Sequence, residues 1–225
     1  MLKIEMLGGF EARLALGDEL VFGVRKAKAI LSYLALAPGY SVPRARLVHL
    51  LWSERGEEQA RGSLRQALAA LKKGLRESAP DEPVPLVSGR ETVALAAEQV
   101  VVDAGQFERL AQSGDIADLL AADALYRGDL LDGFELAEMP FQEWLGHERE
   151  RFRELAFGVL QSLTAHHEET GEFEAAIEAA RRAAAFDPLR ESAHRTLMRL
   201  FDASGQVGLA LKQYESCRDF LQREL

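Results

Sequence analysis

Residues 57–77, with the sequence EEQARGSLRQALAALKKGLRE, are the stretch on which the fold assignment depends. At about 100° per residue, their apolar side chains fall on one side of a helix and predict a buried stripe. That stripe consists of Ala60, Leu64, Ala67, Leu68, Leu71 and Leu75. The opposite face carries Gly62, Arg65, Gln66, Ala69 and Lys73, and Arg61, Lys72 and Arg76 flank it. We therefore expect an amphipathic helix whose exposed face has no acidic residue in its middle.

The segments before this helix predict a small sheet followed by two shorter helices. Residues 2–22 alternate between apolar and polar side chains in three short runs, with a turn expected at Gly17-Asp18 and a third strand at Leu20 and Phe22. From Arg25 the period becomes helical and continues to Pro38-Gly39. A second helix is expected to start near Pro43 and to end at Trp52, because proline suits the first turn of a helix.

The segment after residues 57–77 predicts a hairpin that completes the domain. Three prolines at positions 80, 83 and 85 break the chain, and residues 86–95 then form two short apolar runs around Ser88-Gly89-Arg90. A sheet, three helices and a hairpin within about 100 residues are the layout of a winged helix-turn-helix. We expect this α+β domain to span residues 1–98.

The remainder, residues 99–225, predicts an all-α domain of tetratricopeptide-like helical hairpins. Helices are expected over residues 104–112, 115–127, 141–169, 173–186, 190–203 and 207–224. Thr170-Gly171-Glu172 and Ser204-Gly205-Gln206 lie 34 residues apart, which is the period of a tetratricopeptide repeat, and Ala176 matches Ala210 at the same offset. An unrelated helical bundle remains the alternative.

Charge separates the two halves. The chain has a net charge of −9, but residues 1–76 hold 13 Lys/Arg against 7 Asp/Glu, and residues 101–225 hold 13 against 24. The local balances are therefore +6 and −11. A basic domain followed by an acidic one indicates two separate tasks, and the basic half is compatible with nucleic-acid binding.

The exposed face of residues 57–77 offers the side chains that read and hold DNA. Arg65 and Gln66 can form bidentate hydrogen bonds with guanine and adenine edges. Phosphate contacts are expected from Arg61, Lys72, Lys73 and Arg76, from Arg90 at the hairpin tip, and from Arg44 and Lys26 at the starts of the two preceding helices. The same pattern also fits an ordinary solvated surface, so the prediction of DNA binding depends largely on the neighbouring helices and hairpin.

Enzyme signatures are weak. His166 and His167 are adjacent and so point about 100° apart on a helix. The sequence has no H-E-x-x-H, C-x-x-C or phosphate-binding G-x-x-x-x-G-K motif, and Cys217 has no evident base beside it. We expect no catalysis, cofactor or metal. The lone cysteine and the lack of a signal peptide or membrane span predict a cytoplasmic protein.

Several segments resemble the Streptomyces antibiotic regulatory protein family. Residues 7–11 (LGGFE), 25–31 (RKAKAIL), 47–52 (LVHLLW) and 60–65 (ARGSLR) are similar to its DNA-binding half. Three later segments are similar to the family's bacterial transcriptional activator domain: residues 102–107 (VDAGQF), 126–131 (YRGDLL) and 143–145 (EWL). These motifs occur in the family's order across nearly the whole chain.

The resemblance implies a transcription activator with an OmpR-type winged helix. It implies binding to direct repeats in double-stranded promoter DNA, as a homodimer that contacts RNA polymerase. Members often continue into further modules, so the chain is expected to be a fragment that stops within its second domain. The sequence departs from the family at Ala67, Ala69 and Ala70, where polar residues are usual, which weakens the expected base reading. The alternatives are a protein-interaction scaffold with a degenerate winged helix and the regulatory front end of a larger enzyme.

Overall fold

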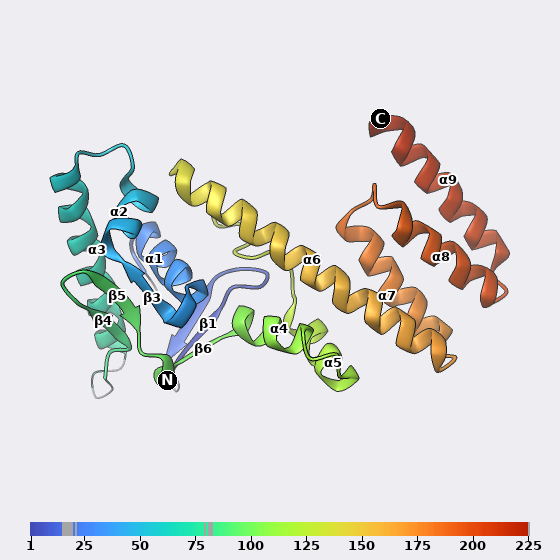
Figure 1. Ribbon diagram of the computed structural model, residues 1–225, viewed down its shortest axis with the longest axis horizontal. Helices are drawn as coiled ribbons and strands as arrows, with labels where there is room; N and C mark the ends of the chain where they lie inside the picture. Colours follow the sequence, from blue (N-terminus) through green and yellow to red (C-terminus); the bar gives the residue numbers. More distant parts are fainter. Residues whose placement is uncertain (15–19, 21, 79, 81–82, 225) are drawn as a thin grey trace. The chain divides into compact units, whose positions relative to one another are not determined.

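The computed structural model describes residues 1–14, 20, 22–78, 80 and 83–224, which pack as two compact units. The first unit comprises Met1–Phe107 and Leu125–Phe152, and the second comprises Glu108–Ala124 and Arg153–Leu225. The structure confirms the predicted fold class, an α+β winged helix-turn-helix followed by tetratricopeptide-like helices (Figure 1). No helix of the described ranges is both long and apolar enough to cross a membrane.

A three-stranded sheet opens the first unit, in the order β2-β1-β6. Its strands are β1 (Leu2–Glu5), β2 (Glu11–Leu14) and β6 (Val100–Val102). The third strand expected at Leu20 and Phe22 is not assigned as a strand and lies partly outside the described residues, although the Leu20 N–H donates to the Ala12 carbonyl of β2 at 2.7 Å. Instead β6 pairs with β1 in parallel, with Leu2 opposite Val100. The expected turn at Gly17-Asp18 lies outside the described residues.

Three helices form the centre of the first unit, as the apolar periodicity predicts. They are α1 (Arg25–Leu36), α2 (Arg44–Trp52) and α3 (Glu57–Ser78), and a 3-10 turn (Pro38–Tyr40) follows α1. The buried residues of α3 are the six of the predicted apolar stripe, namely Ala60, Leu64, Ala67, Leu68, Leu71 and Leu75. The stripe faces α1 and α2, so the charged side of α3 is left exposed.

The predicted hairpin is present and belongs to a second sheet, in the order β3-β5-β4. It consists of β4 (Leu86–Ser88) and β5 (Thr92–Leu95), which pair in antiparallel register, with Val87 opposite Ala94. Strand β3 (Ser41–Pro43) was not predicted, and it fixes the hairpin to the start of α2. A 3-10 turn (Ala97–Gln99) leads from β5 to β6. The hairpin therefore has a fixed position beside the helices.

The first unit also contains residues beyond the expected domain boundary at 98/99. The rings of Phe107, Tyr126 and Phe152 pack together, with centroid distances of 5.4 Å and 6.0 Å from Phe107. The guanidinium of Arg149 donates to the carbonyl oxygens of Leu130 and Leu131, at 2.8 Å and 2.7 Å. These contacts hold residues 125–152 to one another and to Phe107, and the Leu131 N–H, which donates to the Met6 carbonyl at 2.7 Å, connects them to the winged helix. The domain boundary at residues 98/99 stays a prediction.

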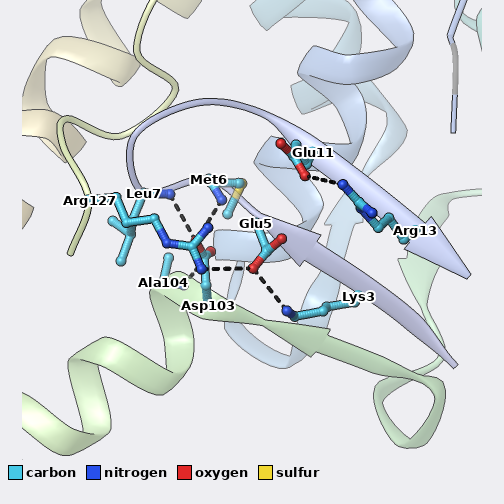
Figure 2. Close-up of polar contacts among 9 residues, drawn as sticks. All are labelled: Lys3, Glu5, Met6, Leu7, Glu11, Arg13, Asp103, Ala104 and Arg127. Atoms are coloured by element: carbon cyan, nitrogen blue, oxygen red, sulfur yellow. Dashed lines mark hydrogen bonds and ion pairs between the residues drawn. The ribbon is translucent and has the colours of Figure 1, made fainter. Parts of the chain in front are cut away.

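A joint between the end of β1 and two later segments holds this unit together (Figure 2). The buried carboxylate of Asp103 accepts hydrogen bonds from the backbone N–H groups of Met6 and Leu7 (2.8 Å and 2.9 Å) and of Ala104 (2.6 Å). The Gly8 N–H donates to the Asp129 carbonyl at 3.0 Å. Three of the sequence motifs, at 7–11, 102–107 and 126–131, therefore meet at one place.

The second unit is built from antiparallel helices. The chain's later helices are α4 (Asp103–Ala111), α5 (Ile116–Leu125), α6 (Met139–Glu169), α7 (Phe173–Phe186), α8 (Glu191–Ala203) and α9 (Val207–Glu224), all within two residues of their predicted bounds. Helices α7, α8 and α9 follow one another side by side (Figure 1). The Arg182 guanidinium holds the Asp123 carboxylate through two hydrogen bonds, which link α7 to α5.

Candidate nucleic-acid interface

A groove of about 1050 Å³ lies between α2, the first half of α3 and the β4–β5 hairpin. Val48, Trp52 and Leu64 contribute apolar side chains to its wall, and Leu64 and Trp52 are buried in the core below. The groove is formed by elements that the two sheets and the helix core hold in place. It is therefore a preformed concave surface.

Five arginine side chains line this groove. Arg44 begins α2, Arg55 follows α2, Arg61 and Arg65 lie on α3, and Arg90 is at the hairpin tip. Two acidic residues, Glu57 and Glu91, also line it, so the cations outnumber the acids. Clustered guanidinium groups attract phosphate and suit its geometry. Four of these five arginines were predicted from the sequence, from three separate segments.

Contacts within the unit position three of the five arginines. The Arg44 guanidinium donates to the Ser88 hydroxyl at 3.0 Å and to the Gly89 carbonyl at 3.3 Å, which ties α2 to the hairpin. Arg55 donates to the Ser63 hydroxyl at 3.0 Å, and Arg61 forms an ion pair with Glu57 one turn earlier on α3. These contacts restrict the three side chains at the groove.

Arg65 and Arg90 have no hydrogen bond or ion pair with any residue of the described ranges, and both are exposed. A guanidinium that is unpaired in the protein keeps all of its donors for another molecule. Among the groove arginines, these two are the most available for an external ligand.

Comparison with known proteins assigns the chain to a family. The profile described as "Bacterial transcriptional activator domain" matches residues 94–225, more than half of the chain. The chain belongs to this family. The predicted resemblance to the Streptomyces antibiotic regulatory proteins is confirmed, and the chain is of transcription-regulator type. No curated protein sequence matches it.

A solved structure has the same fold as this family member. It is Mycobacterium tuberculosis EmbR in complex with a low-affinity phosphopeptide, with a TM-score of 0.75 and 21% sequence identity. The alignment covers 100% of this chain and 60% of the EmbR chain. At this identity the likeness establishes the fold alone.

The remaining predicted residues of α3 lie outside the groove. Gln66 is exposed beside Arg65, and Lys73 is exposed with its ammonium 3.6 Å from the Glu77 carboxylate. Lys72 is half-buried, and Arg76 is exposed near the end of the helix. With a rise of 1.5 Å per residue, Arg76 is about 17 Å along the axis from Arg65. The cations in the second half of α3 thus form a separate group.

Lys26 differs from the other predicted residues, because its ammonium is bound within the first unit. It donates to the Leu51 carbonyl and to the Glu138 carboxylate, both at 2.5 Å, and it lies 4.7 Å from the centre of the Trp52 ring. These contacts connect α1 to the end of α2 and to the residue before α6. The geometry favours a structural role over a phosphate contact.

The groove also contains a residue that the sequence did not single out. Arg55 lies in the short loop before α3, where no periodicity marks it. The signal in the sequence that could have identified Arg55 is its position in the loop between the second and third helices of the predicted helix-turn-helix. Groups of three or more His, Cys, Asp or Glu side chains able to hold a metal ion do not occur in the described part of the chain.

Proposed function

We propose that this transcription regulator activates promoters by binding double-stranded DNA through the arginine-lined groove and the adjoining face of α3. The observation that carries the proposal is the set of five arginines brought to one groove by α2, the loop after it, α3 and the hairpin. A helix and a hairpin that flank a cationic surface are the docking arrangement of a winged helix-turn-helix.

Each side chain has a proposed role. Arg65 and Gln66 read base edges in the major groove, since both can form paired hydrogen bonds with a purine. Arg44 and Arg61 hold phosphates, and Arg90 contacts a phosphate or the minor groove from the hairpin. Lys72, Lys73 and Arg76 add phosphate contacts at the far end of α3. Lys26 is not part of this proposal.

The helical domain is proposed to pair two copies on DNA and to contact RNA polymerase. Residues 101–225 hold 24 acidic against 13 basic residues, so this part of the chain repels phosphate and suits protein partners. Two copies side by side would then read a direct repeat. EmbR was solved with a phosphopeptide, but 40% of the EmbR chain lies outside the alignment with this protein.

A second candidate function is a protein-interaction scaffold whose winged helix no longer binds DNA. Ala69 and Ala70 leave the exposed middle of α3 without polar side chains, and Glu57 already pairs with Arg61. Both observations reduce the DNA contacts that α3 can make. DNA-binding measurements on the intact chain distinguish the two functions.

The test is a fluorescence titration of the full chain against the DNA upstream of its own gene, at two salt concentrations. Arg65→Ala should cost about 1–3 kcal/mol on the bound sequence and relax the preference for it. Lys212→Ala is the charge-matched control, because Lys212 is exposed on α9, outside the first unit. Equal binding by the parent and Arg65→Ala, or no salt-dependent binding by the parent, would support the scaffold instead.

A further inference from the structure

The tip of the β4–β5 hairpin, which carries Arg90, lies beyond the paired residues of its sheet. The pairing of β3 with β5 ends at Pro43 opposite Thr92, and proline has no backbone N–H to donate to a ladder. Residues 89–91 come after the end of β4 and before the start of β5. Within the tip, the Gly89 N–H donates to the Thr92 carbonyl at 2.9 Å. Sheet pairing therefore stops short of Arg90.

Arg44 connects the start of α2 to both sides of this tip. Its guanidinium donates through Nη1 to the Ser88 hydroxyl at 3.0 Å and to the Gly89 carbonyl at 3.3 Å. Its backbone N–H donates to the Glu91 carbonyl at 2.8 Å. These hydrogen bonds end on residues that precede and follow Arg90. A single residue thus restrains the chain on either side of an arginine that has no partner among the described residues.

The other end of this connection is anchored in the core of the first unit. Helix α2 begins at Arg44, and Leu47, one turn later, is fully buried. The Arg44 side chain is half-buried, whereas Arg90 is exposed. A side chain held by two acceptors keeps little rotamer freedom, and this entropy is lost when the protein folds rather than when it binds a ligand. The position of Arg44 is therefore set before DNA arrives.

The two side-chain bonds leave Arg44 with donors for another molecule. Both bonds use Nη1, and a guanidinium has five N–H donors, so Nε and Nη2 keep three donors that no described residue accepts. These donors remain for the phosphate contact proposed above. Holding the hairpin and contacting a phosphate are therefore compatible in one side chain.

We propose that Arg44 is a positioning residue, which holds the hairpin tip so that the Arg90 guanidinium is presented to DNA. The inference rests on the proposed function, because it concerns how much Arg90 contributes to DNA affinity. An arginine on an unrestrained tip loses loop and rotamer freedom on binding, and this loss weakens affinity. A restrained tip loses less, so Arg90 contributes more to affinity while the Arg44 contacts are intact.

A role for Arg44 that is limited to phosphate contact makes a different prediction. In that case Arg44 and Arg90 contact the DNA independently, and their contributions to the binding free energy add. Ser88 separates the two roles, because its hydroxyl accepts a hydrogen bond from Arg44 and carries no charge. Replacing Ser88 disturbs the position of the tip and leaves every cationic group of the groove in place.

The test is a double-mutant cycle on the full chain, titrated with the DNA upstream of its own gene. The variants are Ser88→Ala, Arg90→Ala and the two combined. Arg90→Ala should weaken binding by a factor at least about twofold smaller in the Ser88→Ala background than in the parent. Ser41→Ala is the matched control, because Ser41 is exposed on β3 of the same sheet and is not among the described residues that line the groove. It should leave the effect of Arg90→Ala unchanged.

Arg44→Lys tests the connection from its other end. Lysine keeps the positive charge but replaces the planar fork with a single ammonium, so it should also reduce the effect of Arg90→Ala. A second readout needs no DNA. Nitrogen-15 relaxation should show larger motions of the amides of residues 89–91 in Ser88→Ala and in Arg44→Lys than in the parent.

The outcomes separate this inference from the proposed function. Additive effects of Ser88→Ala and Arg90→Ala, equal coupling of Arg90→Ala to Ser41→Ala, or unchanged motion of residues 89–91 would overturn the positioning role while the parent still binds DNA. An Arg90→Ala variant that binds as tightly as the parent would also overturn it. Absence of salt-dependent DNA binding by the parent would instead overturn the proposed function, and the positioning role with it.

Discussion

Replacing Gly8 with alanine should destabilise the first unit, because the joint leaves no room for a side chain there. Gly8 has a φ of 103°, and a Cβ atom at this position would lie 3.0 Å from the Arg127 Cβ and 3.2 Å from its carbonyl carbon. The unfavourable backbone conformation costs about 1–2 kcal/mol. Crowding against backbone atoms adds about 1–3 kcal/mol. We expect Gly8→Ala to lower the free energy of unfolding by about 2–5 kcal/mol.

Gly9→Ala is the matched control. A Cβ at Gly9 would meet no atom within 4 Å, and Gly9 has no positive φ. The measurement is urea denaturation followed by tryptophan fluorescence, which reports on the first unit because both tryptophans, Trp52 and Trp144, belong to it. Gly9→Ala should change the free energy of unfolding by less than about 0.5 kcal/mol. Equal effects of the two substitutions would refute the close approach of Gly8 to Arg127.

Glu57→Gln should tighten DNA binding about two- to fivefold and steepen its salt dependence by about one unit, because Arg61 loses its ion-pair partner; weaker binding in a titration would contradict this. Lys26→Met should lower the free energy of unfolding by about 1–3 kcal/mol through loss of the largely buried pair with Glu138. The same variant should leave the salt dependence of DNA binding unchanged. A flatter salt dependence would indicate that Lys26 contacts a DNA phosphate. Burial raises the pKa of Asp103, so the folded chain binds this proton more tightly than the unfolded chain. The stability advantage of the parent over Asp103→Asn, measured by urea denaturation, should therefore shrink as pH rises from about 4 to about 7, and growth over this range would refute it.

Local periodicity was sufficient to predict the helices and the face that α3 buries. The apolar residues of α3 repeat every three to four positions, and all six lie in the core as expected. The 34-residue offset likewise predicted two equivalent turns, and Gly171 and Gly205 adopt the same left-handed conformation. These features depend on residues that are close in sequence.

Pairings between distant segments could not be predicted in this way. Strand β6 joins β1 across almost 100 residues, and three consecutive valines indicate a strand but not its partner. Asp103 is similar, because nothing near it in sequence shows that it receives the N–H groups of Met6 and Leu7. Lys26 has the sequence features of a phosphate ligand, and nothing near it in sequence shows that its ammonium contacts Glu138, 112 residues later.

Selection of bound sequences from a random DNA pool tests the central claim most directly. The account predicts that the full chain enriches one sequence, present as a direct repeat, and that Arg65→Ala broadens the preference at the base this side chain reads. A Lys212→Ala control should enrich the parent's sequence. Enrichment of no sequence, or an identical sequence from the parent and Arg65→Ala, would contradict the assignment of the arginine-lined groove and the α3 face to DNA recognition.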